Sequence, residues 1–241
     1  MHTHSRRRIT FAPSMAITLC AMLSVIPQTM AQSPELQEKL AAIKQSSAAN
    51  KQALAHYTWL EQQTTSLKGE VKKTQQFQVR MGPDGQQQKT DLNPQPPPEP
   101  SGGRIKRHIV EKKTEEFQEY GQQIAALGKQ YSQPDMQALQ QAYQQGNISM
   151  QPNGAEGTVN LVIKSYLKPN DSVTLVFNQQ QKAIQSIKVA SYLTDPSDAV
   201  TVAVQFAKLP DGTNHVATVQ VNGVSKQLGV LIQNSAYQPI Q

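Results

Sequence analysis

The sequence predicts an α+β protein built on a strongly curved antiparallel sheet, a half-barrel of about nine strands, with an N-terminal helix and an inserted helical lid. The first observation is a regular alternation of apolar and polar side chains over residues 158–232, with turn signals at intervals of about 12 residues. The second is a shorter block of the same kind over residues 56–92. The third is the total, because roughly nine strands are more than a flat sheet holds without curling.

Residues 1–31 have the composition of a secretory signal peptide. Three arginines at positions 6–8 precede an uncharged apolar run over residues 15–26, and small side chains occupy Thr29 and Ala31, the two positions that a signal peptidase reads. We expect cleavage after Ala31 and a periplasmic or secreted mature chain. The apolar run is shorter than the about 20 residues of a membrane-spanning helix. No permanent membrane span is therefore expected, and a retained anchor is the alternative.

Composition narrows the range of functions. The single cysteine, Cys20, lies within the leader, so the mature chain is expected to contain no disulfide, thiolate metal site or cysteine nucleophile. Leu19 stands where a lipoprotein signal carries a small residue, and the leader arginines leave a twin-arginine signal as an alternative to an ordinary one. Without the three leader arginines, 20 basic residues stand against 17 acidic ones. So weak a positive charge, with no basic stripe, indicates no nucleic-acid partner.

The remaining residues, 32–241, are expected to form a single half-barrel domain that begins with a helix. Residues 33–35 predict the helix start, because the serine side chain can accept a backbone N–H, proline suits the first turn and the acid suits the positive end of the helix dipole. The helix should pack one apolar face on the sheet, formed by Leu36, Leu40, Ile43 and Leu54.

Three strands are predicted next. Residues 57–65 are rich in aromatic and β-branched side chains, residues 71–81 alternate, and residues 86–92 can return antiparallel after the turn at 82–85. By the two-residue period of a strand, the second of these strands should place four apolar side chains on one face: Val71, Phe77, Val79 and Met81.

A proline-rich loop over residues 93–103 interrupts the strands, and a helical insert over residues 104–146 follows it. The loop holds five prolines and is predicted to be a solvated linker, with a polyproline ligand as the alternative. A second helix should be capped by Ser132 and end at Gly146. The first helix of the insert, over residues 104–130, should carry a loose apolar stripe formed by Ile105, Ile109, Phe117, Tyr120, Ile124 and Leu127.

The C-terminal block is predicted to be an antiparallel meander. Apolar positions alternate over residues 158–168, 173–177, 200–206, 216–221 and 228–232. Between Ile184 and Ile187 the parity changes, which predicts a β-bulge near residues 185–186. Residues 209–212 predict a turn, and Asn222-Gly223 predicts a two-residue type I′ hairpin.

The sequence carries no catalytic signature, so we expect no enzymatic activity, no metal and no cofactor. His108, Glu111 and Glu115 fall on one helix face at metal-binding spacings, but a face so rich in charge is more typical of a solvated surface. Glu61 and Glu70 leave an acid–base pair across a hairpin as an alternative to two inert surface carboxylates. A nucleophile elbow, a phosphate-binding loop and a zinc-protease motif are all missing from the sequence. A hydrolase with an unmarked site stays open as an alternative.

The order of these elements resembles the periplasmic outer-membrane lipoprotein-carrier superfamily, also called the lipoprotein-sorting superfamily. The residues that carry the resemblance are Tyr57-Thr58-Trp59 after the first helix, Phe-Ala-Lys-Leu-Pro-Asp-Gly at 206–212, and residues 228–237. The resemblance covers most of the mature chain in layout, and relatives include sensor domains for mislocalised envelope components. It implies an incomplete barrel whose mouth is closed by helices and whose concave face shelters acyl chains, with residues 104–146 as the lid. The proline-rich loop and the glutamine content depart from the family pattern, so the resemblance does not extend to transfer to a dedicated outer-membrane receptor.

The predicted function is binding of a lipid or acyl chain in the concavity, with an envelope protein as a further partner. One amphipathic helix cannot cover all the apolar surface expected there, so the insert or a ligand must fill the rest. The alternative is an envelope scaffold or protein-interaction module, in which the same residues form a filled core and bind no small molecule. The predicted ligand-binding residues are Trp59, Phe77, Val79, Leu161, Ile163, Leu175, Phe177, Val202, Val204 and Phe206.

Overall fold

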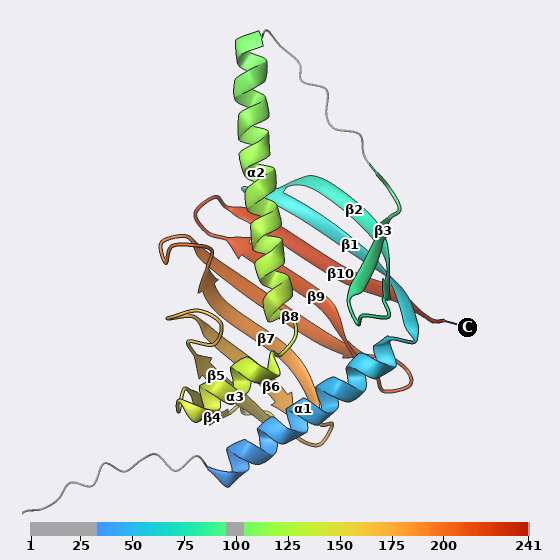
Figure 1. Cartoon of the computed structure of the whole chain (residues 1–241), viewed down its shortest axis with the longest axis vertical. Coiled ribbons are helices and arrows are strands. Elements are labelled where there is room, and N and C mark those ends of the chain that lie inside the picture. The colour runs from blue at the N-terminus through green and yellow to red at the C-terminus, as the bar shows by residue number, and fades with distance from the viewer. Residues whose placement is uncertain (1–32, 95–103, 241) are drawn as a thin grey trace, which may run out of the picture. The chain divides into compact units, whose positions relative to one another are not determined.

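The computed structural model describes residues 33–94 and 104–240, which form three helices and ten strands (Figure 1). The predicted signal peptide and most of the proline-rich loop lie outside the described residues. The helices are α1 (Pro34–Leu54), α2 (Arg104–Tyr131) and α3 (Met136–Gln144). The strands are β1 (Tyr57–Leu67), β2 (Glu70–Met81), β3 (Gln87–Asp91), β4 (Ile148–Pro152), β5 (Thr158–Lys164), β6 (Ser172–Asn178), β7 (Ala183–Tyr192), β8 (Ala199–Lys208), β9 (Asn214–Gly223) and β10 (Leu228–Pro239).

All ten strands belong to one open antiparallel sheet in the order β3-β2-β1-β10-β9-β8-β7-β6-β5-β4. The chain leaves the β3 edge, passes through α2 and α3 to the β4 edge, and returns as a meander until β10 pairs with β1. The three helices lie on one face of the sheet, which we call the concave face (Figure 1). The predicted α+β half-barrel with an N-terminal helix and an inserted helical segment is therefore confirmed.

The sheet has one strand more than the about nine that the sequence predicted. The extra strand is β4, in which only Ile148 and Met150 alternate before Pro152 ends the segment. Two apolar residues are too few to indicate a strand by periodicity, so its pairing with β5 could be seen only in the structure.

The core lies between the concave face of the sheet and all three helices. Apolar side chains from α1, α2, α3 and the strands β4 to β10 form one buried cluster. No fully buried member of this cluster comes from β1, β2 or β3. We call these three strands the wing. Within the described residues, no helix has the length and hydropathy that a membrane crossing requires.

The helix caps follow from local sequence. The Ser33 side chain accepts the backbone N–H of Leu36 at 3.2 Å, as predicted for the start of α1. The prediction for the cap of α3 was wrong, because Asp135 and not Ser132 occupies that position and accepts the N–H groups of Gln137 and Ala138. The Ser132 hydroxyl instead donates to a carbonyl of the last turn of α2.

Two β-bulges decide which side chains reach the concave face. In β7, Val176 pairs with Ser186 and Phe177 with Ile184, which leaves Gln185 as the extra residue and confirms the predicted bulge. In β2, a second bulge at Lys72 was not predicted. It changes the parity of Val71, which is 64% exposed and does not share the face of Val79.

The predicted hairpin turn at Asn222-Gly223 was also wrong. Both residues belong to β9, and the chain turns over residues 224–227, where Gln227 has a φ of 50°. Gly223 pairs with Leu228 in the ladder and does not adopt a positive φ. Its lack of a side chain serves packing, because a Cβ there would overlap the ring and hydroxyl of Tyr120 on α2.

Candidate functional site

Six of the ten predicted ligand-binding residues lie where the helices fill the concavity. They belong to the main buried cluster, together with apolar side chains of α1, α2 and α3. In the described structure, helices cover these side chains, and their contact with a ligand stays a prediction. Each is no more than 2% exposed: Leu161, Ile163, Leu175, Phe177, Val202 and Val204.

Two tyrosines of α2 fix the helix to the sheet. The Tyr120 hydroxyl donates to Asp198 Oδ1 at 2.8 Å, in the loop before β8. At the other end of the contact, the Tyr131 hydroxyl donates to the carboxylate of Asp171 and lies 3.0 Å from Ser191 Oγ. Burial raises the pKa of Tyr131, and the bond to Asp171 raises it further. The phenol therefore keeps its proton and remains a donor at neutral pH.

Close contact between α2 and β9 depends on two glycines. A Cβ at Gly128 of α2 would overlap the side chain of Val221, and one at Gly223 of β9 would overlap Tyr120. Gly121, one turn from Tyr120's far side, is less constrained, because its Cβ would lie 3.7 Å from Leu228. The helix thus seats on the sheet through small residues at defined points, an arrangement that side-chain periodicity does not reveal.

The wing buries a separate group of aromatic side chains on the concave face. Trp59 pairs with Val79 in register, and both are buried outside the main cluster. The Trp59 ring stacks on Tyr237 of β10 with centroids 5.4 Å apart, and Tyr237 lies 4.3 Å from the ring of His215. We call Trp59, Tyr237 and His215 the aromatic stack. The indole N–H of Trp59 is buried and has no hydrogen-bond partner among the described residues.

Burial keeps the aromatic stack uncharged near neutral pH. It raises the pKa of the Tyr237 phenol, and the nearby Glu61 carboxylate raises it further. Burial also lowers the pKa of His215, against a smaller opposite effect of its hydrogen bond to the Val216 carbonyl. The stack is therefore an apolar surface with one free N–H donor, which suits an uncharged portion of a ligand.

Beyond the aromatic stack, the concave face of the wing is polar. Glu61 is 4% exposed and forms an ion pair with Lys89 of the edge strand β3. The Lys89 ammonium also lies 5.8 Å from the centroid of the Phe77 ring. Gln63 and Gln75 pair next to them in register. Phe77 is half-buried among these polar groups, and its contact with a ligand stays a prediction.

Phe206 lies beside a small cavity of about 60 Å³ between α1, the connection from α2 to α3, and the strands β7 to β9. Asn50, Leu54 and His215 also line it. The Asn50 side chain accepts the backbone N–H of Asn214 at 3.1 Å, which joins α1 to β9 at this point. A cavity of this size holds one or two water molecules and no acyl chain.

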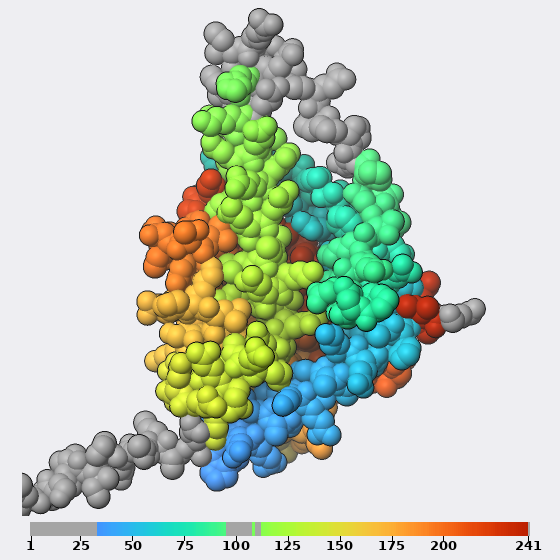
Figure 2. Space-filling model, in the orientation of Figure 1, coloured from blue at the N-terminus to red at the C-terminus, as the bar shows by residue number. Residues whose placement is uncertain are grey.

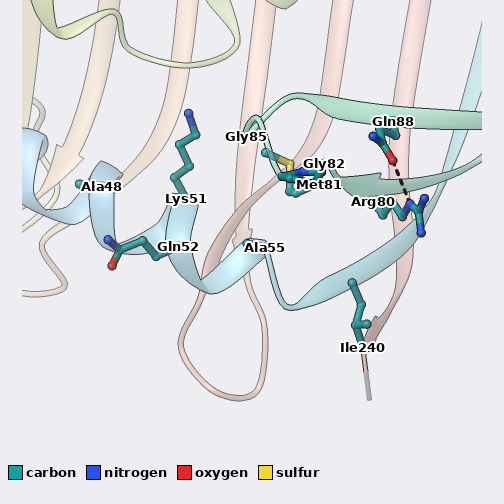
Figure 3. A pocket seen from close by; sticks show the side chains of 11 residues that line it. Ala48, Lys51, Gln52, Ala55, Arg80, Met81, Gly82, Gly85, Gln88 and Ile240 are labelled. Atoms are coloured by element: carbon teal, nitrogen blue, oxygen red, sulfur yellow. Dashed lines mark hydrogen bonds between the residues drawn. The ribbon is translucent and has the colours of Figure 1, made fainter.

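A much larger groove of about 900 Å³ lies between the second half of α1, the turn from β2 to β3, and Ile240 (Figure 3). Figure 2 shows the same face of the molecule hollowed between α2 and the wing. Sequence reasoning missed the groove, because three segments distant in sequence form it and none carries a motif. Its lining is Ala48, Lys51, Gln52, Ala55, Arg80, Met81, Gly82, Pro83, Gly85, Gln88 and Ile240.

The described side chains do not assemble a metal centre or an acid–base pair. No three of their His, Cys, Asp or Glu side chains gather closely enough to hold an ion. Glu61 and Glu70 are each held by a different lysine, Lys89 and Lys72, at different positions along the hairpin. His108 is exposed on α2. What the described face offers chemically is apolar surface, hydrogen-bond donors and positive charge, which are means of binding.

Comparison with known proteins gives a distant likeness of fold. The sequence matches no known family model and no curated protein. A crystal structure of a DUF1329 family protein from Desulfovibrio piger is similar at a TM-score of 0.42 and 10% identity, covering 84% of this chain and 92% of that one. A LolA superfamily protein from Nitrosomonas europaea is similar at a TM-score of 0.38 and 9% identity, covering 84% and 93%. The resemblance to the lipoprotein-carrier superfamily is thus confirmed as a likeness in the course of the chain.

Proposed function

We propose that the chain is an exported, non-enzymatic protein that binds a hydrophobic or lipid-like ligand in the concavity of its curved sheet. In this proposal residues 1–31 are a signal peptide cleaved after Ala31, and residues 32–241 act as one domain in the periplasm or outside the cell. The leader composition supports export, since a basic segment, an apolar run and small residues follow one another in the expected order.

The observation that carries the proposal is the way α2 covers the sheet. The sheet is open, its concave face is apolar beneath α2, and the helix contacts it through Tyr120, Ile124, Leu127 and Tyr131. An acyl chain can replace such contacts, because each buried methylene contributes about 0.8 kcal/mol. A chain of moderate length therefore offsets the loss of one helix face, and α2 acts as the lid.

The ten predicted residues take different parts in this proposal. Trp59 and Val79 line the region next to the wing, with Phe77 at its polar side and Phe206 near α1. The six residues beneath α2 contact the ligand after the helix moves away. The Trp59 N–H, which lacks a partner among the described residues, would donate to an ester or amide oxygen of the ligand.

A second candidate function is an envelope scaffold or interaction module without a small-molecule ligand. One observation favours it: the six residues beneath α2 are almost completely buried by the protein itself. In that case the open strand edges and the exposed part of α2 would contact a protein partner.

Native mass spectrometry of the protein purified from its own host tests the proposal. We expect a co-purified lipid, and a ligand-free species after lipid supplementation would contradict the carrier function and favour the scaffold. A matched pair of variants locates the ligand. Val202→Thr keeps the side-chain shape but places a hydroxyl beneath α2, whereas Val176→Thr makes the same change on the opposite face of the sheet. Lipid affinity should fall about tenfold in the first and stay unchanged in the second, both variants being checked for folding by circular dichroism.

A further inference from the structure

The groove between α1 and the turn from β2 to β3 has an apolar base. Ala48 and Ala55 of α1, Met81 of β2 and Pro83 of the turn contribute to its lining, and Ile240 closes it at the C-terminal end (Figure 3). Met81 follows Phe77 and Val79 on the same face of β2, so the groove continues the concave face of the wing. Its volume of about 900 Å³ lies within the range of small-molecule sites, about 300–1,000 Å³.

Two cationic side chains stand on opposite walls of the groove. Lys51 extends from the last turn of α1 toward the β2–β3 turn, and Arg80 lies on the strand side next to Gln88 (Figure 3). The Lys51 ammonium reaches the turn at Gly85, where an added Cβ would lie only 3.2 Å from Nζ. Gly85 has a φ of 70°, so glycine both allows the turn and leaves room for the ammonium.

Neither cation has a carboxylate partner among the described residues. Arg80 Nε donates to Gln88 Oε1 at 3.0 Å, and the described residues offer no acceptor to Lys51. The carboxylate of the turn, Asp84, accepts the backbone N–H of Gln86 at 3.0 Å and so serves the turn itself. Elsewhere in the wing the ion pairs Lys72–Glu70 and Lys89–Glu61 satisfy the lysines, so the groove differs in keeping two positive charges free above an apolar surface.

We infer that this groove binds the anionic head group of an amphiphilic ligand between Lys51 and Arg80, with the adjoining apolar chain against Met81 and Ile240. Charge complementarity supports this occupant, because a phosphate or carboxylate would receive charge-assisted hydrogen bonds from both walls. The apolar base excludes a fully hydrated ion as the best fit. The inference rests on the proposed function, and it adds a ligand class and a direction: the head group lies at the α1 end of the wing.

A three-ligand titration tests the inference with the purified protein, below the micelle concentration of each ligand. Dodecyl phosphate carries head and tail, dodecanol carries the tail alone, and inorganic phosphate carries the head alone. Dodecyl phosphate should bind at least tenfold more tightly than dodecanol, and inorganic phosphate should show no saturable binding in the millimolar range. The double variant Lys51→Gln/Arg80→Gln should bring dodecyl phosphate to the affinity of dodecanol.

The matched control is Lys44→Gln/Lys73→Gln, which removes two exposed lysines from the same helix and the same strand outside the groove. This control should bind all three ligands as the unchanged protein does. Equal binding of dodecyl phosphate and dodecanol, unaffected by either double variant, would overturn the head-group site and leave the proposed function intact. Failure of both amphiphiles to bind would overturn the two together. Tight binding of inorganic phosphate alone would show a simple anion site and contradict the amphiphile.

Discussion

The helix-covered part of the sheet and the wing belong to one antiparallel sheet, yet their concave faces differ. Beneath α2, the inward positions of β8 and β9 hold Val202, Val204, Val219 and Val221, and they are buried by the helices. At the wing, equivalent positions hold charged and amide groups such as Glu61, Gln63, Gln75 and Lys89. Strand alternation therefore decides which side chains face inward, and their chemistry decides whether a helix can cover them.

This difference separates stability from adaptability. Apolar burial is the main favourable contribution to folding, so the helix-covered part should hold the fold together. The wing has few buried apolar side chains apart from Trp59 and Val79, and its edge strand β3 has only five residues. Regions with few buried apolar contacts open at lower free energy, which suits a ligand-binding surface.

The largest difference between the two regions should appear when a core aromatic residue is truncated. Phe177 is 1% exposed on β6, and Phe177→Ala should reduce the free energy of unfolding by about 3–5 kcal/mol through lost burial and a cavity. Phe206 is half-buried at the margin of the core, so Phe206→Ala should cost about half as much or less. Urea denaturation followed by circular dichroism measures both. Equal costs would show that the core extends evenly to the end of β8 near α1.

The next effect concerns the contact between α2 and β9. Gly128→Ala places a methyl group into Val221, and the overpacking should cost about 1–3 kcal/mol despite the better helix propensity of alanine. Gly121→Ala is the matched control on the same helix, because its methyl group would lie 3.7 Å from Leu228. That variant should gain about 0.5–1 kcal/mol.

Hydrogen exchange shows where the Gly128→Ala effect is located. If α2 is a lid, its amides should exchange faster in Gly128→Ala while those of β5 and β6 keep their protection. Uniformly faster exchange throughout the domain would show that the helix and the sheet open as one cooperative unit, in conflict with a lid.

The sequence allowed prediction of those parts of the fold that depend on local patterns. The Ser33 cap, the bulge at Gln185 and the meander from β5 to β10 follow from capping chemistry and two-residue periodicity. The roles of the glycines did not. Gly223 follows an asparagine and has the signature of a hairpin turn, but its function depends on Tyr120, which is about a hundred residues away and comes into contact only in the folded chain.

The candidate site was predictable only in part, for the same reason. Alternation identified Leu161, Ile163 and Phe177 as inward-facing, but it could not show that α2 buries them. The groove residues Lys51 and Arg80 lie in a helix and a strand with no feature that distinguishes them from other surface cations. Convergence of three distant segments created that site, and a single sequence contains no record of such convergence.

The smallest effect tests the boundary between the two regions, at His215. Burial lowers the pKa of this imidazole below its ordinary value of 6.5, so the folded protein binds fewer protons there than the unfolded chain does. Its contribution to stability is therefore fully present above about pH 6.5 and declines as the pH falls below that value.

Between about pH 7.5 and pH 5.5, the unchanged protein should lose more stability than His215→Gln, because glutamine cannot take up a proton at this position. Urea midpoints of both proteins at the two pH values give the comparison, and the difference between the proteins removes the carboxylates that titrate in both. An identical loss in both proteins would mean that the imidazole is protonated as easily in the folded state as in the unfolded one. The stack of His215 on Tyr237 would then be open to water, and the aromatic stack would belong to the adaptable wing and not to the core.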